Sequence, residues 1–105
     1  MNGDRMSNKT LISTATAHAK GADTAVVYLY DDGSLAYTTK LGIAKTRWQY
    51  AAIPRYRSGA RSVSLASDGA GTLTVTVIFI DNTLAFAKIE QFFNWHFVNK
   101  PDRSP

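Results

Sequence analysis

The sequence predicts an α+β fold: an antiparallel sheet of four to five strands, with an N-terminal and a C-terminal helix packed on one face. Three observations lead to this prediction. Two segments alternate apolar and polar residues around Gly-containing turns, a pattern typical of β-hairpins. A third segment, near the C-terminus, places apolar residues at helical spacing and contains neither Gly nor Pro.

The first half of the chain predicts one helix and two strands. Residues 8–20 begin with an Asn that can cap a helix and end before a Gly, which predicts a short helix. Residues 24–30 predict a strand that is apolar on both faces, which indicates cover on both sides by helices or a second subunit. An Asp-Asp-Gly turn then leads into a predicted strand at 34–39. No repeat at a solenoid period is visible.

The second half predicts three strands and a helix. Residues 45–53 favour a strand that ends at a Pro, and residues 61–67 and 72–80 form the clearest predicted hairpin. Residues 83–98 predict the C-terminal helix, since their apolar residues fall within one arc of about 140° at helical spacing. On that helix Trp95 lies opposite the arc, where a loop, a partner or a second subunit would cover it.

Length and composition limit the classes of protein. The 105 residues, 45% hydrophobic and 19% charged, predict a single domain, 1–105, with frayed polar ends at 1–7 and 99–105. The absence of Cys excludes disulfides, thiolate nucleophiles and cysteine–metal sites. The sequence shows no secretory signal and no apolar run that could span a membrane, so we expect a soluble, cytoplasmic protein without a membrane partner.

The positive charge is concentrated in one part of the chain. The net charge is +4, yet no acidic residue lies between Asp32 and Asp68 while six Lys and Arg do, so this segment carries +6 and the rest −2. Cations interleaved with aromatic rings are typical of surfaces that bind phosphates and unpaired bases. The predicted anion-binding residues of the 40–61 segment are Lys45, Arg47, Arg55, Arg57 and Arg61, and the predicted stacking residues are Trp48 and Tyr56. The alternative is a solvated strand edge, where cations prevent aberrant pairing.

A second candidate site surrounds His96 on the predicted C-terminal helix. A pocket between this helix and the sheet, lined by Tyr28, Phe92 and His96, could hold a small molecule or place the imidazole as a general base. The alternative is a buried core histidine with one hydrogen bond. Nothing in the sequence assigns a catalytic residue, a cofactor or a metal, because no motif with the required spacing is present.

Three functions are consistent with these observations. The favoured one is a small soluble binding or interaction module that acts as a homodimer and contacts nucleic acid or an acidic protein surface. The second is a small-molecule-binding or enzymatic domain with the His96 pocket, and the third is an accessory protein with no active site. The sequence favours a binding role over an enzymatic one.

Overall fold

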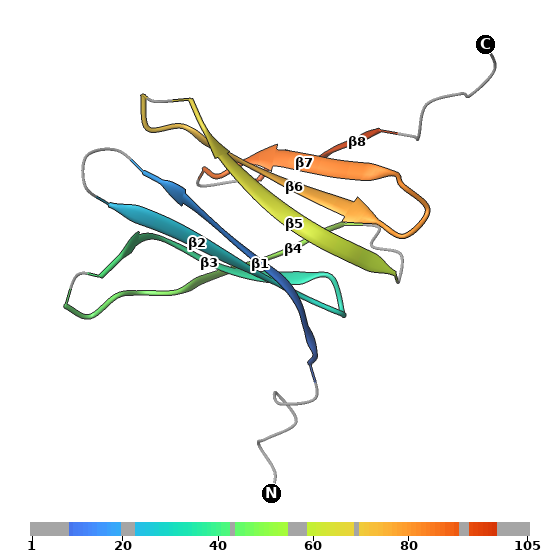
Figure 1. Ribbon diagram of the computed structural model, residues 1–105, viewed down its shortest axis with the longest axis horizontal. Helices are drawn as coiled ribbons and strands as arrows, with labels where there is room; N and C mark the ends of the chain where they lie inside the picture. The colour runs from blue at the N-terminus through green and yellow to red at the C-terminus, as the bar shows by residue number, and fades with distance from the viewer. Residues whose placement is uncertain are drawn as a thin grey trace, which may run out of the picture.

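A computed structural model describes residues 9–19, 23–42, 44–54, 59–68, 70–90 and 93–98, and shows an all-β architecture (Figure 1). Eight strands form two four-stranded antiparallel sheets. The first sheet contains β1 (Leu11–His18), β2 (Thr24–Tyr30), β3 (Ser34–Leu41) and β4 (Gln49–Ala52), in that order. The second contains β5 (Ala60–Ser67), β6 (Leu73–Phe79), β7 (Leu84–Lys88) and β8 (His96–Val98), also in chain order.

Both sheets are meanders, in which each strand pairs with the next one along the chain. The edge strands β1 and β5 lie side by side where the sheets meet (Figure 1). The backbone N–H of Val63 on β5 donates a hydrogen bond of 3.2 Å to Oγ of Ser13 on β1. The two sheets therefore approach most closely along these strands.

The core lies between one face of each sheet. We call these faces the inner faces and the opposite ones the outer faces. The first sheet contributes Val27, Leu29, Leu35 and Tyr37 to the shared core, and the second sheet contributes Val63, Val75, Val77, Phe79 and Ala85. These side chains alternate with outward ones along their strands, as burial of one sheet face requires.

The prediction of an α+β fold is wrong, because the described residues contain no helix. At the predicted N-terminal helix the chain forms β1, in which exposed and half-buried residues alternate. Thr14 and Thr16 show the physical reason: β-branched side chains fit the pleat of a strand better than a helix. Pairing with β2, from Ala17 opposite Ala25 to Thr14 opposite Tyr28, gives this backbone a ladder of hydrogen bonds along one side.

The predicted C-terminal helix is also wrong, since residues 83–98 contain β7, a loop and β8. Asp81 does not cap a helix; its Oδ1 accepts hydrogen bonds from the backbone N–H (3.1 Å) and the hydroxyl (2.7 Å) of Thr83 and closes a hairpin turn. In the strand Ala85 is buried while Phe86 lies on the opposite face. The helical arc had grouped these two residues together. The long strand β6 offers a row of backbone partners, and tertiary pairing overrides helical spacing.

Several predicted strands are confirmed. The strands expected at 24–30, 34–39, 61–67 and 72–80 correspond to β2, β3, β5 and β6, and the segment 45–53 contains β4. The ends expected to be frayed, residues 1–7 and 99–105, lie outside the described residues. Among the described residues, none belongs to a helix with the length and hydropathy needed to cross a membrane.

The two sheets are structural repeats, although no repeat is visible in the sequence at a solenoid period. The β1–β2 pair of Thr14 with Tyr28 corresponds to the β5–β6 pair of Val63 with Val77, each residue 49 positions later. Both hairpins contain a register shift at equivalent positions, between Leu11 and Ser13 and between residues 60 and 62. The equivalent sequences are Asp32-Gly33-Ser34-Leu35-Ala36-Tyr37 and Asp81-Asn82-Thr83-Leu84-Ala85-Phe86.

Hydrogen bonds outside the ladders repeat as well. The N–H of Asp31 donates to the carbonyl of Thr10 (2.9 Å), and the N–H of Ile80 donates to that of Gly59 (2.7 Å). The fourth strands are equivalent with an offset of 47 residues, so that Trp48 before β4 matches Trp95 before β8. Each repeat is thus one complete four-stranded unit.

Candidate functional site

The outer face of the second sheet carries a pocket of about 310 Å³. Its lining comes from β6, β7, the loop that follows β7, and β8, and consists of Thr74, Phe86, Lys88, Glu90, Asn94 and His96. The rings of Phe86 and His96 stack with their centroids 5.2 Å apart and their planes 24° apart. The pocket therefore has an aromatic floor and a polar, charged rim.

Strand pairing positions these side chains. Phe86 and His96 are direct partners across β7 and β8, and Thr74 and Lys88 are direct partners across β6 and β7. Paired residues project from the same face of a sheet, so all four point outward together. Leu84 and Val98, the next pair toward the other end of β7 and β8, continue this surface.

The lining of the pocket combines apolar and charged groups. A stacked aromatic pair offers a flat apolar surface, while Lys88 and Glu90 provide one charge of each sign at its rim. Lys88 and His96 are exposed, so they can meet a ligand or a partner without rearranging the sheet. No group of three or more His, Asp or Glu that could hold a metal ion exists within the described ranges.

Tyr28 and His96, two of the three residues of the predicted His96 pocket, lie on different sheets. His96 is exposed on β8 rather than on a helix, and Phe92 lies outside the described residues. Tyr28 lies on the outer face of the other sheet, where its ring contacts that of Trp48 with centroids 5.1 Å apart. The predicted location between a helix and the sheet is therefore wrong.

The predicted anion-binding residues are divided between the two ends of the sheets. Lys45 and Arg47 are exposed in the β3–β4 loop, at the end where the pocket lies. Arg61 lies at the opposite end, where its Nη1 donates a hydrogen bond of 3.2 Å to Oδ1 of Asn82. Arg55, Tyr56 and Arg57 lie outside the described residues, and Trp48, the other predicted stacking residue, contacts Tyr28 of its own chain.

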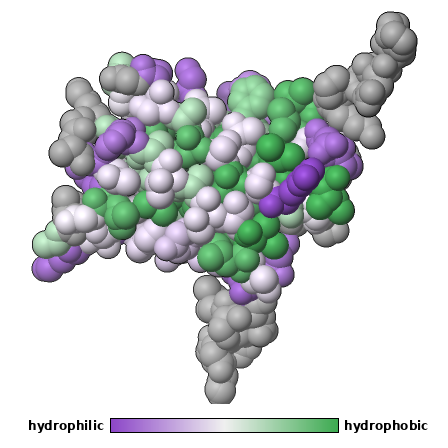
Figure 2. Space-filling model, in the orientation of Figure 1, coloured by the Kyte–Doolittle hydropathy of each residue, from purple (hydrophilic) through white to green (hydrophobic). Residues whose placement is uncertain are grey.

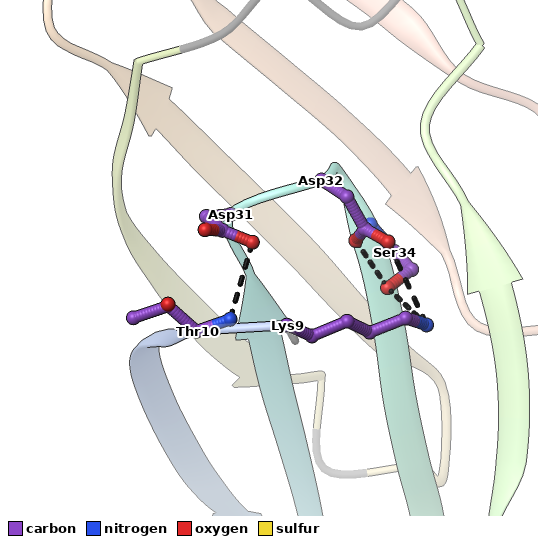
Figure 3. A network of polar contacts seen from close by, with 5 residues as sticks. All are labelled: Lys9, Thr10, Asp31, Asp32 and Ser34. Atoms are coloured by element: carbon purple, nitrogen blue, oxygen red, sulfur yellow. Dashed lines mark hydrogen bonds and ion pairs between the residues drawn. The ribbon is translucent and has the colours of Figure 1, made fainter. Parts of the chain in front are cut away.

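A polar network at the β2–β3 turn serves the fold (Figure 3). Oδ1 of Asp32 accepts hydrogen bonds from the backbone N–H (2.9 Å) and the hydroxyl (2.6 Å) of Ser34, and Nζ of Lys9 lies 3.6 Å from its Oδ2. The hydrogen bond from the Ser34 hydroxyl is the largest cause that holds the pKa of Asp32 below its usual value, with Lys9 adding to it. Thr10 donates its backbone N–H to Asp31 (3.2 Å). These contacts tie the start of β1 to the turn.

Trp95 is half-buried against its own chain. Its ring stacks on that of Phe93 with centroids 5.7 Å apart, and Phe93 contacts Tyr37 of the first sheet edge-on at 5.2 Å. Both residues pack against the shared core. The prediction that Trp95 lies on the outer side of a helix is wrong, because Trp95 lies in the loop before β8 and packs on its own chain.

Aromatic side chains instead gather on the outer face of the first sheet. We call this surface, formed by Tyr28, Tyr30, Trp48 and Tyr50, the aromatic face; Tyr50 is 75% exposed. The pocket face is the corresponding outer surface of the second sheet, formed by Ile78, Leu84, Phe86, His96 and Val98. Apolar surface also gathers toward the end that carries the β6–β7 turn (Figure 2), where Ile80 is 68% exposed.

Sequence reasoning missed most of the pocket. Thr74, Lys88 and Asn94 are not among the predicted pocket residues, and Phe86 falls within the helical arc predicted for residues 83–98. Two signals could have found them: the period-two alternation of residues 84–88, and the match of that segment to residues 35–39 in the preceding repeat.

Comparison with known proteins adds no relative: no protein-family model matches the chain, and searches of curated proteins and of solved structures found no significant match.

Proposed function

We propose that this protein is an interaction module that binds a protein partner through the pocket face. The proposal rests on one observation: equivalent residues of the two repeats differ in how far their side chains are exposed. Leu35 and Tyr37 on the first sheet are 1% and 7% exposed because the second sheet covers them. Their equivalents Leu84 and Phe86 lie on an outer face and remain partly exposed.

The difference in exposure between equivalent residues extends across the whole pocket face. Val27 and Leu29, 1% and 0% exposed, correspond to Thr76 and Ile78, which are only partly buried. Ala51 packs on the shared core, whereas its equivalent Val98 is 42% exposed. Contiguous apolar surface rimmed by polar groups is typical of protein-binding sites. A second β-sheet is therefore the kind of partner that this face fits.

The repeat architecture supports this function. Each repeat is a four-stranded meander with a 49-residue period, and neighbouring sheets pack face to face with their first strands adjacent. Size, strand order and packing match the blades of β-propellers, which stack four to eight such sheets around an axis. In that arrangement each blade binds the next through its face, as the two repeats do here.

A fusion of two complete chains tests whether the pocket face accepts a further sheet. The fusion places 17 residues (99–105 and 1–10) between β8 and the following β1, whereas seven residues (53–59) suffice between β4 and β5. The chain has no cysteine, so Val98→Cys in the first copy introduces a unique thiol. We expect alkylation of this thiol at nanomolar protein to be at least about tenfold slower than in the single chain, because burial limits access. Equal rates would contradict the proposal.

A small-molecule ligand is the second candidate, favoured by the stacked Phe86 and His96 rings beside Lys88 and Glu90. Such a pocket fits a flat ring that carries a charged group. Titration with aromatic carboxylates, followed by the amide signals of β7 and β8, tests this candidate with His96→Ala as the comparison. A nucleic acid or acidic protein partner in the cytoplasm also stays a proposal, supported by the exposed Lys45 and Arg47.

A further inference from the structure

We propose that the partner of the pocket face is the aromatic face of a second copy of this chain, bound head to tail. The inference rests on the proposed function, since it names the occupant of the same surface. Within the part of the chain that the structure describes, no further sheet packs on the outer face of either sheet, and the repeat indicates that these two faces belong together.

The contact between the two repeats is the template for this interaction. Within the chain, the inner face of the first sheet meets the inner face of the second. The pocket face is equivalent to the inner face of the first sheet, because in the repeat Phe86 corresponds to Tyr37 and Val98 to Ala51. The pocket face therefore has the same backbone shape as a surface that already binds a sheet.

The aromatic face is equivalent to the inner face of the second sheet, the other surface in the contact between the repeats. Tyr28 and Tyr30 correspond to Val77 and Phe79, which are 0% and 7% exposed in the core. Thr14, exposed on the same face, corresponds to Val63, which is 6% exposed. A second copy thus carries, free in solution, the equivalent of the surface that covers the first sheet.

The side chains of the two faces are complementary. Inside the chain Phe93 contacts Tyr37 across the sheet interface, and Trp95 stacks on Phe93. In the proposed contact the segment of the second copy that carries Trp48, the equivalent of Trp95, lies against the pocket face beside Phe86. Tyr and Trp rings are enriched at protein interfaces, and Lys88 at the rim can place its ammonium over such a ring.

The interaction joins two different surfaces, so a bound pair of copies still has one free pocket face and one free aromatic face. Such heterologous contacts form a closed ring when the rotations between successive copies add up to a full turn. Since sheets of this kind close into rings of four to eight, we infer a ring of about two to four chains. The 52 × 44 × 20 Å dimensions of one copy, long in two directions and thin in the third, suit a sector of a ring.

Two exposed substitutions test the proposal, one on each face. Thr14→Glu places a charge on the aromatic face and Val98→Glu places one on the pocket face; both positions are exposed, so the fold is expected to persist. Ala70→Glu, in the exposed β5–β6 turn, is the matched control. Mass is measured by light scattering and sedimentation at micromolar concentration, with circular dichroism as the check on folding.

The head-to-tail arrangement predicts a specific pattern. We expect the wild type and Ala70→Glu to form the same oligomer, and each face variant to be a monomer of 11.5 kDa. An equimolar mixture of the two variants retains one intact pair of faces, so it is expected to form a 1:1 dimer and nothing larger.

Other outcomes overturn the proposal. Self-association of Thr14→Glu alone would show that two pocket faces bind each other, and a monomeric wild type would show that a second copy is not the occupant. A mixture that stays monomeric would exclude the pairing of these two faces. Slow thiol alkylation in the fused chain together with a monomeric wild type would show that the pocket face accepts a sheet only when the two are covalently linked, so the interaction function would stand and the self-association of free copies would be overturned.

Discussion

Gly33 and Asn82 occupy equivalent positions in the β2–β3 and β6–β7 turns, and both have a positive φ, 84° and 68°. The N–H of Gly33 donates to the carbonyl of Tyr30 at 3.1 Å, and that of Asn82 to the carbonyl of Phe79 at 2.8 Å. Gly and Asn are the residues that most readily adopt this left-handed conformation. The two turns therefore share the same backbone hydrogen bond and the same left-handed position.

Substitution of Asn82 tests the conformational demand of this turn. We expect Asn82→Ala to lower the free energy of unfolding by about 1 kcal/mol, because Ala has a Cβ but no polar side chain to offset the left-handed strain. Asn82→Gly is expected to stay within about 0.5 kcal/mol of the wild type, because Gly adopts a positive φ freely. Both variants lose the contact with Arg61, so their difference in urea unfolding isolates the backbone effect. Equal losses would contradict this reading.

Gly59 and Gly42 provide a second matched pair. Their φ angles are 100° and 101°, but a Cβ at Gly59 would lie 2.9 Å from Cγ1 and Cδ1 of Ile80, whereas one at Gly42 would meet nothing within 4 Å. Each Gly→Ala change is expected to cost about 1–2 kcal/mol from strain. We expect Gly59→Ala to cost more, measured by thermal and urea unfolding. The excess should disappear in the Ile80→Ala background, and its persistence there would exclude the Ile80 contact as its cause.

The Asp32 turn predicts a contribution to acid stability. Its hydrogen bonds lower the folded-state pKa, so the stabilisation is present above the unfolded pKa of about 3.9 and is lost as pH falls through the folded-state pKa. The difference in unfolding free energy between wild type and Asp32→Asn is therefore expected to be largest above about pH 4 and to shrink in more acidic solution. Ser34→Ala removes the hydroxyl hydrogen bond, the largest cause of the lowered pKa of Asp32, and is therefore expected to reduce the pH dependence of the unfolding free energy. A difference that does not vary with pH would contradict this assignment.

The two equivalent tryptophans are expected to differ in what they stabilise. Trp95 packs against the shared core, so Trp95→Ala is expected to lower the free energy of unfolding by about 3 kcal/mol, near the lower end for such truncations. Trp48 contacts Tyr28 on an outer face, so Trp48→Ala is expected to cost less stability and to weaken self-association instead. Urea unfolding at low protein concentration and sedimentation at high concentration measure the two effects. A larger stability loss for Trp48 would reverse the assignment.

Local pattern predicted the strands that alternate cleanly and the hairpin turns between them. It failed at residues 83–98, where Phe86 and His96 share a helical arc but also share a strand face, since they pair across β7 and β8. Spacing alone cannot distinguish these arrangements when the apolar residues come in short runs. The pocket was missed for the same reason, although His96 had been singled out.

By itself the sequence determined a chain without cysteine chemistry, the hairpin turns at Gly33 and Gly71, and the strands on either side of them, because these depend on composition and on the conformational preferences of neighbouring residues. Only the tertiary structure decided that residues 11–18, 84–88 and 96–98 are strands and that the sheets are repeats. It also decided which equivalent face is covered: Tyr37 is buried and Phe86 is not. Burial depends on which sheet packs on which, and that is set by contacts between residues about 50 positions apart, such as Ser13 and Val63.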